Sequence, residues 1–195
     1  MRTFLINLDR RPDRWVVVRE HLADMDISVT RFSGIDNGWR GCRDSHLECI
    51  RQIWQEKKAG MILEDDVEFL VTKNHLIDYL VDVKSQLHPD WDALYLGASP
   101  QEPQIRYSQN LFRLNNAWCT HAIIWNPRKG GAMAYILDHK SEINKIDVFF
   151  ANEVMPRFNI FITYPMICTQ RQTQSDTCKR SDTSTLLTNY NLYCK

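Results

Sequence analysis

Short apolar runs alternate along this chain with segments whose apolar residues recur at helical spacing. The runs predicted to be strands span residues 3–8, 28–33, 61–63, 92–96, 111–114, 121–125 and 159–163. Strands that alternate with helices predict an α/β fold, in which helices flank a mostly parallel central sheet. The chain has 195 residues, of which 44% are hydrophobic, and it shows no internal repeat, so we expect a single domain.

The helices are predicted from periodicity and from capping residues. Apolar residues from Trp15 to Met25 lie on one face of a first helix. Residues 38–43 are expected to form a loop, and residues 45–48 match a capping box that would start a second helix. A third helix follows Asn74 and ends before Pro89, and a fourth is expected to start at residues 126–127, with asparagine as its N-cap.

The charge balance excludes some classes of partner. Lysine plus arginine and aspartate plus glutamate number 24 each, so no global basic field favours nucleic acid or an anionic membrane. No apolar run is long enough to cross a bilayer. Charged residues also follow the first apolar run too soon for the apolar segment of a signal peptide. We therefore expect a cytoplasmic protein without nucleic-acid partners.

The six cysteines predict no structural zinc site. They form no C-x-x-C pair, and no cysteine–histidine spacing matches a four-ligand zinc motif. Free thiols are the expectation without a secretory signal, and a bridge between Cys178 and Cys194 is the minority alternative.

Three consecutive carboxylates, residues 64–66, follow the apolar run 61–63. A buried strand that ends in this way delivers oxygen ligands to the carboxyl edge of a sheet, where α/β proteins bind ligands. Because side chains alternate along a strand, Glu64 and Asp66 should share a face and Asp65 should not. Glu64 and Asp66 are therefore the preferred pair for a divalent metal, and a solvated acidic turn is the alternative.

Several segments of the chain resemble glycosyltransferase family 25 in their order. The segments are residues 6–14, 32–36, 41–46 and 62–67, followed by Tyr164, Pro165, Gln170, Ser175 and Asp176. This family includes bacterial lipooligosaccharide galactosyltransferases and animal collagen hydroxylysine galactosyltransferases. The resemblance spans residues 3–177. Each motif alone is weak evidence for the resemblance, but five motifs in the right order are specific.

The resemblance implies a GT-A-type domain with an inverting, metal-dependent activity. The donor would be a nucleotide-sugar, often UDP-linked, held with Mn²⁺ (or Mg²⁺). A nucleotide-binding half would span about residues 1–97 and an acceptor half about residues 98–177, with a tail at 178–195. The acceptor would be a hydroxyl of a glycan, a lipid-linked sugar or a protein. The sequence leaves the sugar, the acceptor, the linkage and the oligomeric state open.

Candidate residues for holding the nucleotide-sugar lie at the predicted strand ends and on the helix start. They are Asn7, Asp9, Arg10, Arg11, Arg14, Asp36, Ser45, His46 and Asp65. Arginine suits phosphate oxygens, and the acidic residues would accept hydrogen bonds from ribose or base. Six of them have a structural alternative: a solvated helix start for the arginines, a turn for Asp36, and helix capping for Ser45 and His46. Asp176 would complete the metal site if the tail folds back.

An inverting transfer needs a base that takes the proton of the acceptor hydroxyl. Asp147 is the first candidate because its segment resembles an Asp-x-Phe segment of the family, and Glu153 is the second. The alternative for Asp147 is a helix N-cap. A non-catalytic domain that only binds a nucleotide-sugar or glycan is the competing interpretation for the whole chain. A nucleotidyltransferase is less favoured because the loop at residues 9–12 contains no glycine.

Overall fold

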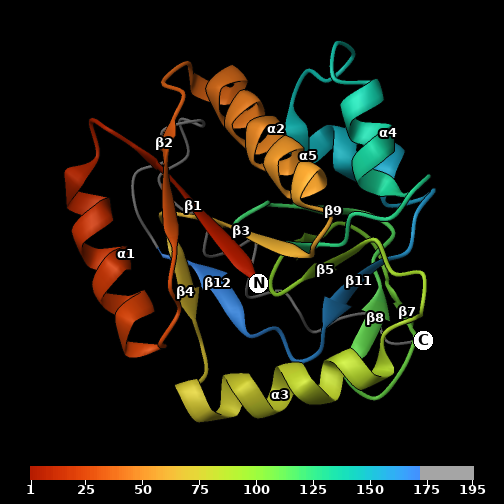
Figure 1. Ribbon diagram of the computed structural model, residues 1–195. Coiled ribbons are helices and arrows are strands. Elements are labelled where there is room, and N and C mark those ends of the chain that lie inside the picture. The colour runs from red at the N-terminus through yellow and green to blue at the C-terminus, as the bar shows by residue number, and fades with distance from the viewer. Residues whose placement is uncertain (172–195) are drawn as a thin grey trace.

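The computed structural model describes residues 1–171, which form a mixed α/β fold with helices on both faces of a central sheet (Figure 1). The helices are α1 (Pro12–Asp24), α2 (Gly38–Glu56), α3 (Lys73–Gln86), α4 (Ala132–Asp138) and α5 (Ile146–Phe149), which continues into a π-helical turn, η1 (Phe150–Val154). The predicted α/β class with its flanked sheet is confirmed.

The main sheet has eight strands in the order β2-β1-β3-β10-β5-β11-β8-β7. Their bounds are β1 Arg2–Leu8, β2 Thr30–Gly34, β3 Gly60–Glu64, β5 Ala93–Tyr95, β7 Ile105–Arg106, β8 Leu111–Arg113, β10 Ala122–Trp125 and β11 Ile160–Thr163. Most strands run in one direction, whereas β10 and β8 run against their neighbours. Two small antiparallel pairs complete the fold: β4 (Val67–Phe69) with β12 (Cys168–Gln170), and β6 (Ser99–Pro100) with β9 (Ala117–Trp118).

Alternating side chains of the strands divide the core into two layers. Phe4 and Ile62 pack with α2, α4 and α5, whereas Leu5 and Leu63 pack with α1 and α3. This alternation is the period of an extended strand buried on both faces. It also decides to which side each residue beyond the end of β3 points.

Helix α2 begins seven residues before the predicted capping box. Residues 38–43 are helical rather than a loop, because Asn37 serves as the N-cap and its carbonyl accepts the Gly41 N–H at 3.1 Å. Ser45 consequently lies inside the helix, where its hydroxyl donates to the Gly41 carbonyl at 2.7 Å and accepts the Ile35 N–H at 2.9 Å. The capping role predicted for Ser45 is therefore wrong.

The start of α4 also differs from the prediction. Asn126 donates its side-chain amide to the Trp91 carbonyl and caps no helix. The helix begins at Ala132, whose N–H donates to the carboxylate of the buried Asp92 at 3.0 Å. This cap comes from a residue forty positions away, which local sequence patterns do not reveal.

Gly41 allows the chain after β2 to lie directly on α2. A Cβ at this position would be 1.8 Å from the Ile35 carbonyl oxygen, which is a backbone atom that cannot rotate away. We therefore expect Gly41→Ala to lower the free energy of unfolding by about 3 kcal/mol, as overpacking does. Urea denaturation followed by circular dichroism measures this change.

Gly38→Ala is the matched control for this prediction. Gly38 begins the same helix with φ at +52° and has open space around its Cβ position, so alanine there adds only backbone strain of about 1–2 kcal/mol. Equal loss of stability in the two variants would contradict the role given to the close contact at Gly41.

Candidate functional site

Strands β1, β2 and β3 are parallel, so their carboxyl ends meet at one edge of the sheet. The reversed strand β10 begins at this same edge and brings Thr120 and His121 beside the end of β3. The Glu64 N–H donates to the His121 carbonyl at 3.0 Å. The polar groups at this edge therefore come from both parallel and antiparallel strands.

The three acidic residues at the end of β3 point in different directions. Glu64 reaches toward α2, where its Oε1 lies 3.0 Å from His46 Nε2. Asp65 turns to the opposite face and contacts Arg14 of α1. This division continues the alternation of Ile62 and Leu63 in the strand below.

Asp65 lies in a buried polar network at the end of β1. Its carboxylate accepts from Arg14 at 2.8 Å and from the Asn7 amide at 2.7 Å, and the ion pair leaves 9% of each charged side chain exposed. The Asn7 oxygen in turn accepts two N–H groups of Arg31. The structure thus joins three of the candidates for holding a nucleotide by hydrogen bonds: Asn7, Arg14 and Asp65.

Glu64 accepts hydrogen bonds that favour its ionised form. Burial by itself raises the pKa of Glu64, but the hydrogen bond from His46, its charge and the Thr120 hydroxyl at 2.6 Å lower the pKa to about 2. Both of these hydrogen bonds are made to Oε1. Glu64 is therefore an oriented carboxylate that is ionised at neutral pH.

Asp66 has the opposite electrostatic situation. Burial, followed by the charges of Glu64 and Asp65, raises the pKa of Asp66 to about 7. The Gln170 amide lies 3.3 Å and 3.4 Å from the two carboxylate oxygens, and the Arg171 N–H donates to the Asp66 carbonyl at 2.7 Å. A cation at this position would offset both the burial and the neighbouring negative charges that raise this pKa.

Asp147 and Cys42 lie near this acidic group. Burial raises the pKa of the Cys42 thiol well above its usual range, and the neighbouring carboxylates Glu64, Asp147 and Asp66 raise it further, in that order. Asp147 is the second residue of α5, and the N-cap of that helix is Lys145. The N-cap alternative for Asp147 is therefore wrong, although its Oδ1 accepts the Val148 N–H at 2.9 Å.

The other candidates at the edge form exposed ion pairs. Arg10 pairs with Asp36 at 2.7 Å, and Arg11 pairs with its helix neighbour Asp13 at 2.8 Å. Asp9 accepts from the Ser33 hydroxyl and from Arg31, which lower its pKa. His46 is fully buried against Glu64 and caps no helix, and Asp176 lies outside the described residues.

Thr120 and Arg31 were not predicted from the sequence. Thr120 precedes a strand, and the carboxyl-end rule covers only residues that follow one, so the reversal of β10 hid it. Arg31 lies within β2 and reaches across to β1, which a pattern read along a single strand does not reveal. The only local signal for such a contact was that a charged residue, Arg31, occurs within a short strand.

No protein-family model matches this chain. No curated protein matches it either. Solved structures that resemble it include protein A197 from STIV, with a TM-score of 0.46, 11% identity, and coverage of 83% of this chain and 81% of that one. A mannose-1-phosphate geranyltransferase from Thermus thermophilus has a TM-score of 0.44 and 13% identity, with 82% of this chain and 58% of that chain covered.

A third structure is a 4-diphosphocytidyl-2C-methyl-D-erythritolsynthase from Anaerococcus prevotii. It has a TM-score of 0.45 and 8% identity, with 95% of this chain and 75% of that chain covered. Likenesses at this level carry no argument about the activity of the chain, which must be argued from its own residues.

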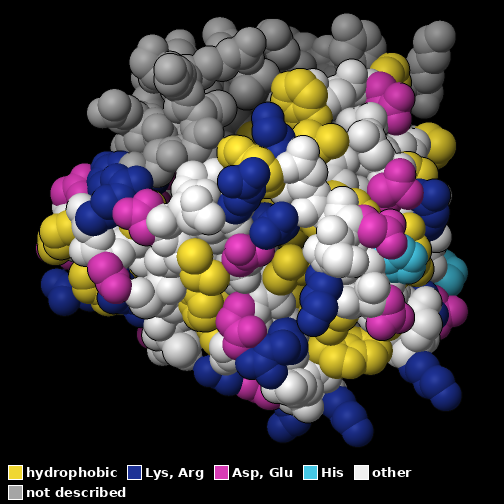
Figure 2. Space-filling view, turned by 90° about the horizontal axis from the view of Figure 1, so that it is seen from above, with side chains coloured by type: hydrophobic (Ala, Val, Ile, Leu, Met, Phe, Trp, Pro, Cys, Tyr) yellow, Lys and Arg dark blue, Asp and Glu magenta, His cyan; other side chains and the backbone are white. Residues whose placement is uncertain are grey.

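The molecular surface adds no strong field of one sign on the face that Figure 2 shows. Basic and acidic side chains are intermixed there. Among residues 1–171, no helix is both long and apolar enough to cross a bilayer.

Proposed function

We propose that this chain is a metal-dependent glycosyltransferase that moves a sugar from a nucleotide-sugar, UDP-linked by preference, to an acceptor hydroxyl. The observation that carries the proposal is the arrangement of Glu64 and Asp66. Both carboxylates lie at the carboxyl edge of the sheet, while the intervening Asp65 is held by Arg14. Together with the ordered motifs that resemble glycosyltransferase family 25, this arrangement supports a GT-A-type domain.

The donor set fits a hard divalent cation such as Mn²⁺ or Mg²⁺. Carboxylate oxygens are the ligands that these ions prefer, and burial followed by the charges of Glu64 and Asp65 raises the pKa of Asp66. Glu64 and Asp66 would hold the ion, with Asp176 as a further candidate. Bound there, the ion would stabilise the charge that develops on the departing nucleoside diphosphate.

The protein residues have the remaining tasks. Thr120 and His46 fix the orientation of Glu64, and the Gln170 amide holds Asp66 in place. Asp9, Arg10 and Asp36 form the exposed rim on which the nucleoside would lie. Asp147 would accept the proton of the acceptor hydroxyl, as the base that an inverting displacement requires.

A panel of nucleotide-sugars tests this proposal. UDP-galactose, UDP-glucose, UDP-xylose and GDP-mannose are each added with and without Mn²⁺, and binding is measured by thermal shift and calorimetry. A ligand that binds the folded state raises the unfolding temperature, so one donor should give a Mn²⁺-dependent increase. A folded protein that responds to no donor would contradict the proposal. Donor binding without sugar transfer to any hydroxyl acceptor would favour the non-catalytic domain.

Replacing Asp147 with asparagine should separate binding from transfer. The amide keeps the size of the side chain but cannot take a proton, so we expect donor binding to persist and turnover to fall about 10²–10⁴-fold. Initial rates of nucleotide release and donor affinities by calorimetry measure the two effects.

Glu153→Gln is the control for Asp147→Asn. Glu153 pairs with Arg157 at 2.8 Å on the surface, so its replacement should leave turnover unchanged. The assignment of the base to Asp147 would be abandoned if Glu153→Gln lost turnover instead, or if Asp147→Asn lost its far-ultraviolet dichroism.

A further inference from the structure

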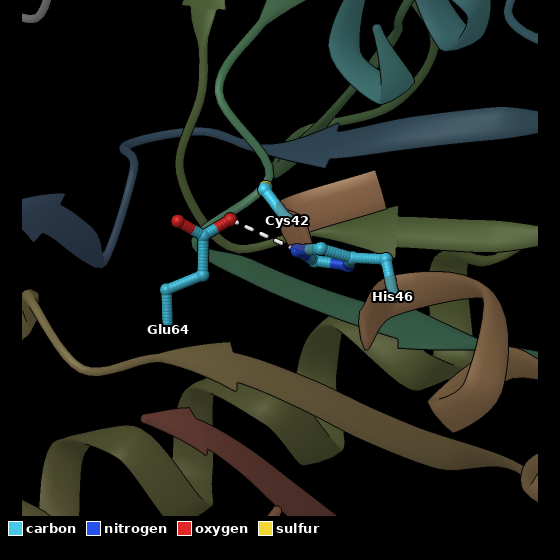
Figure 3. A group of neighbouring side chains, drawn as sticks. All are labelled: Cys42, His46 and Glu64. Carbon is cyan, nitrogen blue, oxygen red and sulfur yellow. Dashed lines mark hydrogen bonds and ion pairs between the residues drawn. The ribbon is translucent and has the colours of Figure 1, made fainter. Parts of the chain in front are cut away.

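Three side chains of different chemistry converge between α2 and the end of β3 (Figure 3). They are the thiol of Cys42, the imidazole of His46 and the carboxylate of Glu64, and one ligand atom from each lies within 4.8 Å of the other two. Figure 3 shows the three side chains directed toward one another across the space between helix and strand. No other such group of cysteine, histidine and acidic residues occurs within residues 1–171.

Regular secondary structure fixes the backbone positions of all three residues. Cys42 and His46 are four residues apart in α2, so they lie on the same side of the helix. Glu64 is the last residue of β3, and its N–H bond to the His121 carbonyl holds it there. The Thr120 hydroxyl donates to Glu64 and orients the carboxylate, as residues around metal ligands commonly do.

The distances are close to those of a tetrahedral site. Zinc binds sulfur at about 2.3 Å and nitrogen or oxygen at about 2.0–2.2 Å, which places neighbouring ligand atoms about 3.3–3.7 Å apart. His46 Nε2 and Glu64 Oε1 are already 3.0 Å apart, and the largest separation in the group needs about 1 Å of side-chain adjustment. Three protein ligands with one open position is the pattern of a zinc ion that keeps a water molecule.

The donor set selects a different class of ion from the one proposed for Glu64 and Asp66. Thiolate and imidazole favour Zn²⁺ over Mn²⁺ and Mg²⁺, which prefer oxygen. Glu64 Oε1 lies 3.0 Å from the imidazole of His46, and the charges of Glu64, Asp147 and Asp66 reach Cys42. The local field is thus negative and favours a cation.

We propose that Cys42, His46 and Glu64 form a zinc site, and that Zn²⁺ bound there withdraws Glu64 from the site of the hard cation. On binding, a sulfur–zinc bond replaces the sulfur–hydrogen bond of Cys42, and the proton passes to the buffer. The competition for Glu64 rests on the proposed function, whereas the binding of Zn²⁺ itself does not.

Cobalt substitution tests the site without any nucleotide. Co²⁺ is a spectroscopic substitute for Zn²⁺, and a cobalt–thiolate bond gives a charge-transfer absorption in the near ultraviolet. We expect this absorption to saturate at one Co²⁺ per chain and to disappear when one equivalent of Zn²⁺ is added. Absence of the band in the folded wild-type protein would overturn the proposal.

Substitutions assign the band to its ligands. Cys42→Ser should abolish the band and weaken Zn²⁺ binding at least about a hundredfold, and His46→Ala should weaken it comparably. Cys49→Ala removes a buried thiol two turns further along the same helix and should leave the band intact. The double variant Cys178→Ser/Cys194→Ser, at positions outside the described residues, should also keep it.

Opposite results from these variants would contradict the site. A band that survives Cys42→Ser, or that is lost in Cys178→Ser/Cys194→Ser, would show that the metal binds elsewhere. Circular dichroism and unfolding midpoints of the metal-free variants show whether each one is folded. His46→Gln, which retains a polar side chain of similar length, serves if the alanine variant does not fold.

A final measurement addresses the competition. In the presence of Mn²⁺ and the donor found by the panel, Zn²⁺ should inhibit turnover of the wild-type protein, and Cys42→Ser should resist this inhibition at least tenfold. Zinc binding without inhibition would retain the site and reject the competition. If no donor binds at all, the cobalt result still decides whether the zinc site exists.

Discussion

Asp66→Asn should lower metal-dependent turnover at least about a thousandfold and also stabilise the metal-free protein above pH 7. An amide cannot supply the negative charge that holds a divalent cation, so the stabilisation of the leaving group is lost. Turnover with the donor found by the panel, at saturating Mn²⁺, measures the first effect. Calorimetry with the same donor should show that nucleotide binding no longer depends on Mn²⁺.

The stability effect follows from the raised pKa of Asp66, which is about 7 in the folded protein against 3.8 for an ordinary aspartate. Between these values the folded state binds the proton more strongly than the unfolded state. The free energy of unfolding of the metal-free wild type therefore falls as pH rises from about 4 to 7. Asparagine has no proton to lose, so the variant should be more stable at pH 8, on the order of 2 kcal/mol.

Urea denaturation of metal-free protein between pH 5 and 8 tests this dependence. The pKa of Glu64 is lowered to about 2, so its contribution to stability is lost only as pH falls below about 4.5, outside this window. Glu68→Gln is the control, because Glu68 lies two residues further along, in β4. An Asp66→Asn variant that keeps wild-type turnover would reject Asp66 as a metal ligand, and an unchanged pH profile would reject the repulsion described for it.

Arg14→Met should destabilise the fold by about 3–5 kcal/mol. Methionine fills the space of the arginine stem but leaves the Asp65 carboxylate buried with only the Asn7 amide as a partner. Removing one member of a buried ion pair costs this much because the remaining charge is uncompensated. The midpoint of urea denaturation and its slope give the change.

Two further variants separate the ion pair from the helix itself. Arg19→Met makes the same substitution at an exposed position of α1 and should leave the midpoint unchanged. Arg14→Met combined with Asp65→Leu removes both charges and should recover much of the lost stability. If the double variant is no more stable than Arg14→Met alone, the buried charge is not the cause.

The sequence predicted those parts of the fold that depend on local periodicity. The strand at 61–63 and the face of α1 that contains Val18 and Leu22 were recognised because a continuous apolar run and helical spacing are local signals. The alternation of side chains along a strand also predicted that Glu64 and Asp65 would point to opposite sides, as they do.

The parts that sequence reasoning missed depend on contacts between distant segments. The start of α4 reflects the cap from Asp92, which lies forty residues earlier in the chain. His46 was predicted to line a donor site or cap a helix, but no local pattern could show that its imidazole faces Glu64 eighteen residues later. Tertiary contacts override local capping preferences in these cases.

The pairing of β12 with β4 has a practical consequence for attaching the protein to a support. It brings Arg171 to the acidic edge, where its N–H donates to the Asp66 carbonyl. Arg2 lies at the other end of β1, about 20 Å away along a seven-residue strand. An affinity handle or surface linkage placed before Arg2 would therefore lie at the opposite end of β1 from the acidic edge, whereas an insertion directly after Arg171 would lie beside that edge.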